Sequence, residues 1–120
     1  MADADARLMA ILRIGHDTSM RGEGLSLRDA LARTEYATRR RHFGPEELRL
    51  IIAAHPSLVE EWLAYSEDKR TTSGWYVLRN GELGQVLKPA SRLRYASIQE
   101  SVAEFVVREL DFWSGLGATV

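Results

Sequence analysis

The 120-residue sequence predicts an α+β fold in which N-terminal helices precede a small antiparallel sheet and a C-terminal helix packs on that sheet. Three observations lead to this prediction. Apolar residues recur at helical spacing before residue 70, polarity alternates around Asn80-Gly81, and helical spacing returns from Ile98. Because the length suits one domain and the sequence contains no internal repeat, we expect residues 1–120 to form a single domain.

The composition excludes several classes of protein. Apolar residues form 45% and charged residues 28% of the chain, which argues against a disordered tail or a fibrous repeat. The absence of cysteine excludes disulfides and thiolate zinc sites, and an N-terminus unlike a signal peptide predicts a cytoplasmic protein. No apolar run is long enough to span a bilayer, so no membrane partner is expected. A net charge of -1 makes a nucleic-acid partner unfavourable.

The first predicted helix runs from about Asp3 to Ile14, with Gly15 as its C-terminal stop. Its apolar stripe consists of Leu8, Ile11 and Leu12. A loop is expected from His16 to Leu25, because this glycine-containing stretch has no periodicity. Ser26 then predicts the start of a second helix as its N-cap, with Asp29 at the capping-box position.

Two helices joined at a proline corner are expected next. Pro45, followed by Glu46-Glu47, begins the first, because proline suits the first turn and acids favour the positive end of the helix dipole. Pro56 disfavours helical geometry at His55, so a new helix runs from Ser57 to about Lys69. The faces predicted to be buried are Leu48, Ile51, Ile52 and His55 on the first helix and Leu58, Val59, Trp62 and Leu63 on the second.

A β-hairpin is predicted over residues 74–87. Its two strands flank Asn80-Gly81, a dipeptide that suits a two-residue type I′ turn. That turn pairs Arg79 with Glu82, Leu78 with Leu83 and Trp75 with Val86, so opposite charges meet. Pro89 is expected to end the second strand. A short third strand is predicted from Leu93 to Ala96, because an isolated hairpin is marginally stable.

The last predicted helix begins at a capping box formed by Ser97 and Glu100. Its apolar stripe consists of Ile98, Val102, Phe105, Val106, Leu110 and Trp113. Its polar face, expected to meet water, consists of Gln99, Glu104, Arg108 and Asp111. This stripe is the surface that should pack on the sheet.

The sequence shows no catalytic constellation. The histidines, His16, His42 and His55, lie in different segments and lack metal-ligand spacing, and His55 is expected at the edge of the core. His16-Asp17 could form an oriented base, although helix-end capping explains the pair more simply. No serine lies in a G-x-S-x-G elbow, and Glu60-Glu61 and Glu67-Asp68 are expected to be solvated. We therefore expect a protein that is not an enzyme and has no cofactor or metal.

One cluster of cations lies beside an aromatic residue, in the string Arg39-Arg40-Arg41-His42-Phe43. Guanidinium groups match phosphate oxygens, so Arg39, Arg40 and Arg41 form a basic patch that phosphate binding would use. The simpler interpretation is a solvated segment between helices whose cations pair with nearby carboxylates. The near-zero net charge favours this interpretation.

The most distinctive string, Tyr65-Ser66-Glu67-Asp68-Lys69-Arg70, ends a helix and is followed by Gly74-Trp75-Tyr76. Charged and aromatic residues at such a corner have the composition of interface anchors. We therefore predict partner-binding residues here, namely Tyr65, Glu67, Asp68, Lys69, Arg70, Trp75 and Tyr76. The structural alternative places Lys69 and Arg70 at the negative end of the helix dipole and Trp75 in the core.

This string and its order of elements resemble small uncharacterised bacterial proteins, some of which sit beside toxin genes as immunity proteins. The resemblance covers Leu58 to Trp113 and is specific only over residues 65–70 and 74–76. The pattern includes a cysteine in the final helix, where this chain reads Ser101-Val102-Ala103. The resemblance implies a protein partner and carries over no functional residue.

Three functional classes are compared: a protein-binding module, a winged-helix DNA-binding protein and an enzyme, of which the last is disfavoured because no nucleophile, base or metal set is visible. Helix, corner, helix and hairpin is also the order of elements in a winged-helix DNA-binding protein, and cations lie near the hairpin at Arg79, Lys88, Arg92 and Arg94. The helix that would enter the major groove, however, carries Glu60, Glu61, Glu67 and Asp68, whose carboxylates would face phosphates. We therefore predict a protein-binding module, with DNA binding as the alternative.

Overall fold

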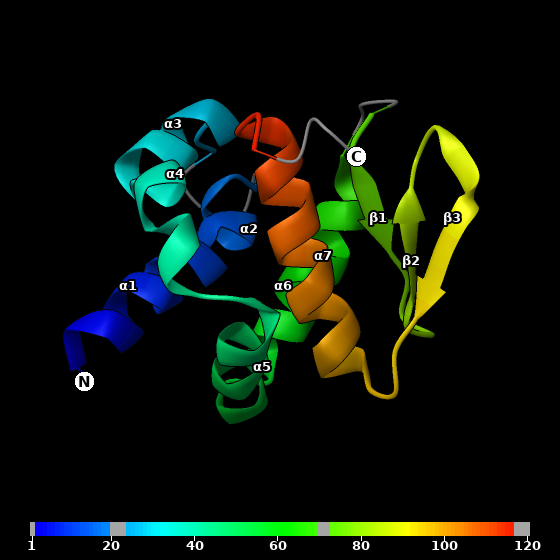
Figure 1. Ribbon diagram of the computed structural model, residues 1–120, viewed down its shortest axis with the longest axis horizontal. Helices are drawn as coiled ribbons and strands as arrows, with labels where there is room; N and C mark the ends of the chain where they lie inside the picture. The colour runs from blue at the N-terminus through cyan, green and yellow to red at the C-terminus, as the bar shows by residue number, and fades with distance from the viewer. Residues whose placement is uncertain (1, 20–23, 70–72, 117–120) are drawn as a thin grey trace.

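A C-terminal helix, α7 (Ile98–Trp113), lies between a group of helices and a three-stranded antiparallel sheet (Figure 1). The computed structural model describes residues 2–19, 24–69 and 73–116, without the side chains of 2–4 and 89–91. The helices before the sheet are α1 (Ala2–Leu12), α2 (Ile14–Asp17), α3 (Leu27–Arg33), α4 (Tyr36–Arg39), the 3₁₀ turn η1 (Arg40–His42), α5 (Pro45–Ala54) and α6 (Ser57–Asp68). The α+β prediction is confirmed.

The predicted helix starts are confirmed where a side chain satisfies a free N–H. The Ser26 hydroxyl accepts from the N–H of Asp29 at 3.1 Å, and the Ser97 hydroxyl accepts from the N–H of Glu100 at 3.2 Å. Leu58, Val59, Trp62 and Leu63 of α6 are buried as predicted. His55 ends α5 but is exposed, so its predicted place at the core edge is wrong.

Gly15 does not terminate the first helix. Helix α1 ends at Leu12, and a separate short helix, α2, begins at Ile14. Helix α2 contains Gly15 as well as His16 and Asp17, two residues that were predicted to begin a loop. A Cβ at Gly15 would lie 2.9 Å from Cδ2 of Trp62. The indole Nε1 of Trp62 also donates to the Leu12 carbonyl at 2.8 Å. Glycine is therefore required by packing, because α2 lies directly against the indole ring.

The hairpin forms, but its predicted register is wrong by one residue. Strands β1 (Trp75–Val77) and β2 (Glu82–Gln85) pair Trp75 with Gln85, Tyr76 with Gly84 and Val77 with Leu83. The loop is longer by one residue than a type I′ turn, and Gly81 has a φ of +93° whereas Asn80 has no positive φ. This register buries Val77 opposite Leu83 on the face toward α7, so core packing decides it.

The slip in register also changes the partner of Arg79. Its guanidinium was predicted to pair with Glu82, but it donates two 2.8 Å hydrogen bonds to the carboxylate of Glu60 on α6. Glu82 instead accepts from the Tyr76 hydroxyl at 2.8 Å. The Tyr76 ring lies against Gly84, where a Cβ would approach its hydroxyl to 3.0 Å. The hairpin is thus tied to α6 by a cross-element ion pair.

The third strand, β3 (Lys88–Arg94), begins earlier than predicted. Pro89 lies within it and does not end the second strand, and the predicted end at Ala96 is two residues too late. The sheet order β1-β2-β3 makes β3 an edge strand, where a missing N–H is tolerated. Its pairing with β2 is irregular between Leu83 and Gln85.

We expect Gly15→Ala to destabilise the protein by about 1–3 kcal/mol, because the added methyl group overpacks the contact with Trp62. Urea unfolding monitored by tryptophan fluorescence measures the effect. Asp5→Glu is the control, since it adds one methylene group at an exposed position of α1. Equal unfolding midpoints for Gly15→Ala and the wild type would contradict the packing argument.

Candidate functional site

A buried carboxylate lies under the corner between α6 and β1. Glu109 of α7 is fully buried, and its Oε2 accepts from Lys69 Nζ at 2.6 Å, from the Tyr65 hydroxyl at 2.8 Å and from Trp113 Nε1 at 2.9 Å. Its Oε1 accepts from the backbone N–H of Trp75 at 2.8 Å. A buried charge is tolerated only when it is paired and hydrogen-bonded, and this one has four donors. We name these five residues the Glu109 cluster.

The Glu109 cluster fits its neighbours closely. Gly74 has a φ of +87°, and a Cβ there would lie 2.7 Å from Glu109 Oε1 and 2.8 Å from Lys69 Nζ. Burial, reinforced by the charge of Glu109, raises the pKa of the Tyr65 hydroxyl far above its ordinary value. Tyr65 therefore stays protonated and acts as a hydrogen-bond donor, which is a structural role.

The outer edge of β1 is sealed by side chains. The N–H of Trp75 donates to Glu109, the carbonyl of Trp75 accepts from Lys69 Nζ at 2.9 Å, and the N–H of Val77 donates to the Ser66 hydroxyl at 2.9 Å. At the other edge, β3 carries Pro89 and irregular pairing, two features that oppose strand addition. Neither edge favours a partner that extends the sheet.

The predicted partner-binding residues separate into two groups. The side chain of Lys69 is only 9% exposed, Trp75 is 6% exposed, and Tyr65 donates inward to Glu109, so the structural alternative describes these three. Arg70 lies outside the described residues. Glu67 and Asp68 are exposed, and Tyr76 is half-buried. Of the seven predicted residues, Glu67, Asp68 and Tyr76 are therefore the ones that remain accessible at this corner.

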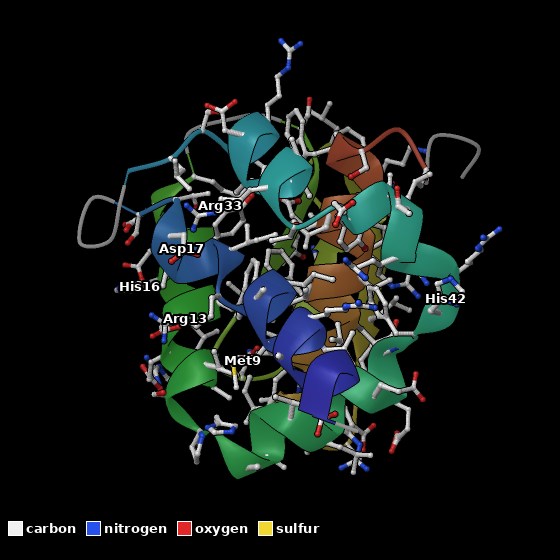
Figure 2. The ribbon with its side chains drawn as sticks, turned by 90° about the vertical axis from the view of Figure 1, so that its left-hand side faces the viewer. Met9, Arg13, His16, Asp17, Arg33 and His42 are labelled. Atoms are coloured by element: carbon white, nitrogen blue, oxygen red, sulfur yellow. The ribbon has the colours of Figure 1, made fainter. Side chains whose placement is uncertain are left out.

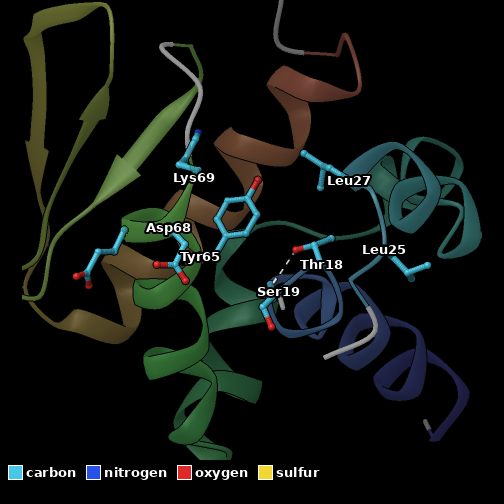
Figure 3. A pocket seen from close by; sticks show the side chains of 9 residues that line it. Thr18, Ser19, Leu25, Leu27, Tyr65, Asp68 and Lys69 are labelled. Carbon is cyan, nitrogen blue, oxygen red and sulfur yellow. Dashed lines mark hydrogen bonds between the residues drawn. The ribbon is translucent and has the colours of Figure 1, made fainter. Parts of the chain in front are cut away.

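A hollow of about 670 Å³ opens beside the corner, between α6 and the segment from α2 to α3 (Figure 3). Its α6 side contains Tyr65, Glu67, Asp68 and Lys69. The facing side contains Gly15, Thr18, Ser19, Leu25 and Leu27. Sequence analysis did not single out the second group, because these residues follow no periodic pattern and meet α6 only in the fold.

A smaller hollow of about 260 Å³ lies on the other side of Glu67. Its lining includes Ser66, Tyr76, Leu78 and Arg79, so Glu67 borders both hollows. Leu78 is 44% exposed, which is high for a leucine. We name Glu67, Asp68, Tyr76 and Leu78 the corner surface. It combines two carboxylates, a phenol and an aliphatic side chain around two concavities.

The predicted basic patch is divided by the fold. Arg40 points inward and binds Asp111 of α7 through Nε at 2.8 and 3.1 Å, and Arg39 pairs with Glu35 at 2.9 Å. Arg41 is exposed and donates to His42 Nε2 at 3.4 Å. Pairing with carboxylates, the simpler interpretation, thus describes Arg39 and Arg40.

Asp111 was expected to face water, and that expectation is wrong. It accepts from the buried Tyr36 hydroxyl at 2.7 Å as well as from Arg40. Burial first, and then Asp111, raises the pKa of Tyr36 far above its ordinary value. Tyr36 is therefore a permanent donor to Asp111, and both residues serve to attach α4 to α7.

The histidines do not converge. Figure 2 shows His16 near Asp17 and Arg33, with His42 on the far side of α1. His16 Nδ1 lies 3.9 Å from Glu61 Oε2, and Asp17 pairs with Arg33 at 3.5 Å. Glu61 is half-buried, not solvated as expected. Among the residues that the structure describes, no group of three or more histidines and acids is placed to hold a metal.

In comparisons with known proteins, no family model, no curated protein and no solved structure matches the chain. None of the helices in residues 2–19, 24–69 and 73–116 is both long and apolar enough to cross a membrane.

We expect Glu109→Gln to cost about 3–5 kcal/mol of folding free energy, because Lys69 is left buried without a counter-charge. Lys69→Met should cost a similar amount. The double variant should cost clearly less than the sum, since no unpaired charge remains. Urea unfolding of all four proteins gives the coupling energy, and strictly additive losses would contradict the proposed pairing.

Proposed function

We propose that this chain is a non-enzymatic protein-binding module whose partner docks on the corner surface. The observation that carries the proposal is the pair of hollows on either side of Glu67, bordered by exposed polar and apolar side chains. Concave surfaces of mixed chemistry suit the anchoring side chains of a protein partner. The partner would contact side chains, because both sheet edges oppose strand addition.

The charge of the corner surface favours a basic partner. Glu67 and Asp68 are exposed and form no ion pair with any described residue, while the nearby charge of Lys69 is balanced by buried Glu109. Complementary charge mainly accelerates association. We infer in particular a role of the immunity type in the cytoplasm, in which binding neutralises a toxin, because the helix–corner–strand pattern resembles such proteins.

The winged-helix alternative is less favoured. The outward face of α6 exposes Glu60, Glu67 and Asp68, and the nearest hairpin cation, Arg79, is already bound to Glu60. A helix with this face would repel phosphates on approaching a DNA groove. The remaining cations near the hairpin lie on β3, at Lys88, Arg92 and Arg94.

Charge reversal tests the corner. We expect Glu67→Lys/Asp68→Lys to weaken capture of the partner from source-cell extract about tenfold or more, with unchanged stability, because both side chains are exposed. The control, Asp5→Lys/Asp29→Lys, makes the same change in charge at exposed sites on α1 and α3. Quantitative mass spectrometry compares proteins held by each variant. A set of captured proteins that is identical for the corner variant and the control would refute the proposal.

A growth assay tests the finer proposal. If the captured partner is a toxin, wild-type chain should restore growth of cells that express it and the corner variant should not. If the corner variant restored growth as well as the wild-type chain does, the corner surface would not be responsible for neutralising the toxin.

The DNA-binding alternative makes its own prediction. Because the face of α6 is acidic, we expect no retardation of a mixed-sequence 30-base-pair duplex in a gel-shift titration at low salt. Retardation at micromolar protein that weakens steeply with added salt would instead favour DNA binding and would make the cations of β3 the contact residues.

A further inference from the structure

A third concave site, formed by residues remote in sequence from the corner surface, lies between α1 and η1, the turn that follows α4. It has a volume of about 120 Å³ and is lined by Arg7 and Leu8 of α1 and by Arg39, His42 and Phe43. Leu8 and Phe43 are the apolar members, half-buried and buried respectively. The other three lining residues are two arginines and a histidine, and we name this site the cationic cleft.

The backbone explains why these residues meet. In a 3₁₀ turn, residues three apart in sequence lie on the same side, so Arg39 and His42 share one face. Arg40 falls on another face, where Asp111 binds it. Because of this turn geometry, Arg40 points toward Asp111 and has a structural role, whereas Arg39 and Arg41 point away from it.

The floor of the cleft is held in place from within the fold. Arg40 Nη1 donates to the carbonyl of Phe43 at 2.9 Å, and its guanidinium lies 5.4 Å from the centre of the Phe43 ring. Phe43 also makes an edge-to-face contact with buried Tyr36, with ring centres 5.9 Å apart. Because Asp111 fixes Arg40, the apolar floor is ordered before any ligand arrives.

The rim of the cleft carries excess positive charge. Arg7 and Arg39 line it, and Arg41 is exposed next to His42. Among the described residues, the acid paired with this group is Glu35, which binds Arg39 through one guanidinium nitrogen, Nη2. A guanidinium has five N–H donors, so Arg39 keeps donors for a second acceptor.

From this arrangement we propose that the cationic cleft binds an oxyanion carried on an apolar group. The apolar group enters between Leu8 and Phe43, and the oxyanion lies against Arg7, Arg39 and His42. The cleft volume of about 120 Å³ is somewhat smaller than that of an apolar cavity that binds benzene, about 150 Å³, so the apolar group is at most one aromatic ring and the oxyanion stays at the rim. Guanidinium forks match both carboxylate and phosphate oxygens. This inference is independent of the corner surface.

Four small probes test the proposal by NMR titration of the full ¹⁵N-labelled chain: phenyl phosphate, benzoate, inorganic phosphate and phenol. We expect phenyl phosphate or benzoate to shift the amides of Leu8, Arg39, His42 and Phe43 with saturation. The tighter of the two should bind at least about fivefold more strongly than inorganic phosphate or phenol, because only it uses both halves of the cleft. Which of the two is tighter tells whether the natural oxyanion is a phosphate or a carboxylate.

Two double variants with the same change in charge distinguish specific binding in the cleft from general electrostatic attraction of the anionic probe to the protein. Arg7→Gln/Arg39→Gln should weaken the tighter probe about tenfold or more, because both lining cations are lost. Arg13→Gln/Arg28→Gln removes the same charge at exposed positions outside the cleft and should leave binding within about twofold. Equal weakening by both variants, or an aromatic oxyanion that binds no better than inorganic phosphate, would overturn the proposal.

Discussion

The carboxylate of Glu109 is the constraint on which the rest of the structure depends. A charge that is fully removed from water must find donors, and those of Glu109 come from three elements: Tyr65 and Lys69 from the end of α6, Trp75 from β1 and Trp113 from α7 itself. These donors are 34 and more residues away in sequence, Trp113 excepted. All of them are satisfied only when the helix, the strand edge and α7 meet at one point. Lys69 completes the arrangement by also sealing the carbonyl of Trp75.

Asp111 repeats this arrangement on the other side of the same helix. Two residues correspond to about 200° of helix rotation, so Glu109 faces α6 and the sheet while Asp111 faces Tyr36 and Arg40. Helix α7 is thereby attached on both sides by a carboxylate. Both proposed binding surfaces depend on it: the corner through the Glu109 cluster, and the cationic cleft through Arg40 and Phe43. A single helix therefore links two surfaces of opposite charge.

The parts of the fold that the sequence predicted are those governed by neighbours within one turn. The caps at Ser26 and Ser97 act on N–H groups three residues away, and they were predicted correctly. The predicted hairpin register was wrong by one residue. Asn80-Gly81 and the neighbouring charges indicate where the turn lies, but they do not decide between loops that differ in length by one residue. The choice between them was made by burial of Val77 opposite Leu83 against α7, which is a long-range contact.

For the candidate site, the sequence by itself determined that charges and aromatic residues gather where α6 ends, and that no catalytic set is recognisable. Only the tertiary structure decided which of them face outward: it buries Lys69 and Trp75, exposes Glu67 and Asp68, and sets α2 and α3 across the hollow from them. It also turned one of three consecutive arginines, Arg40, inward toward Asp111. Helical periodicity places a polar residue on a face of its own helix, but its burial depends on whether donors from distant segments arrive there, and that is a property of the whole fold.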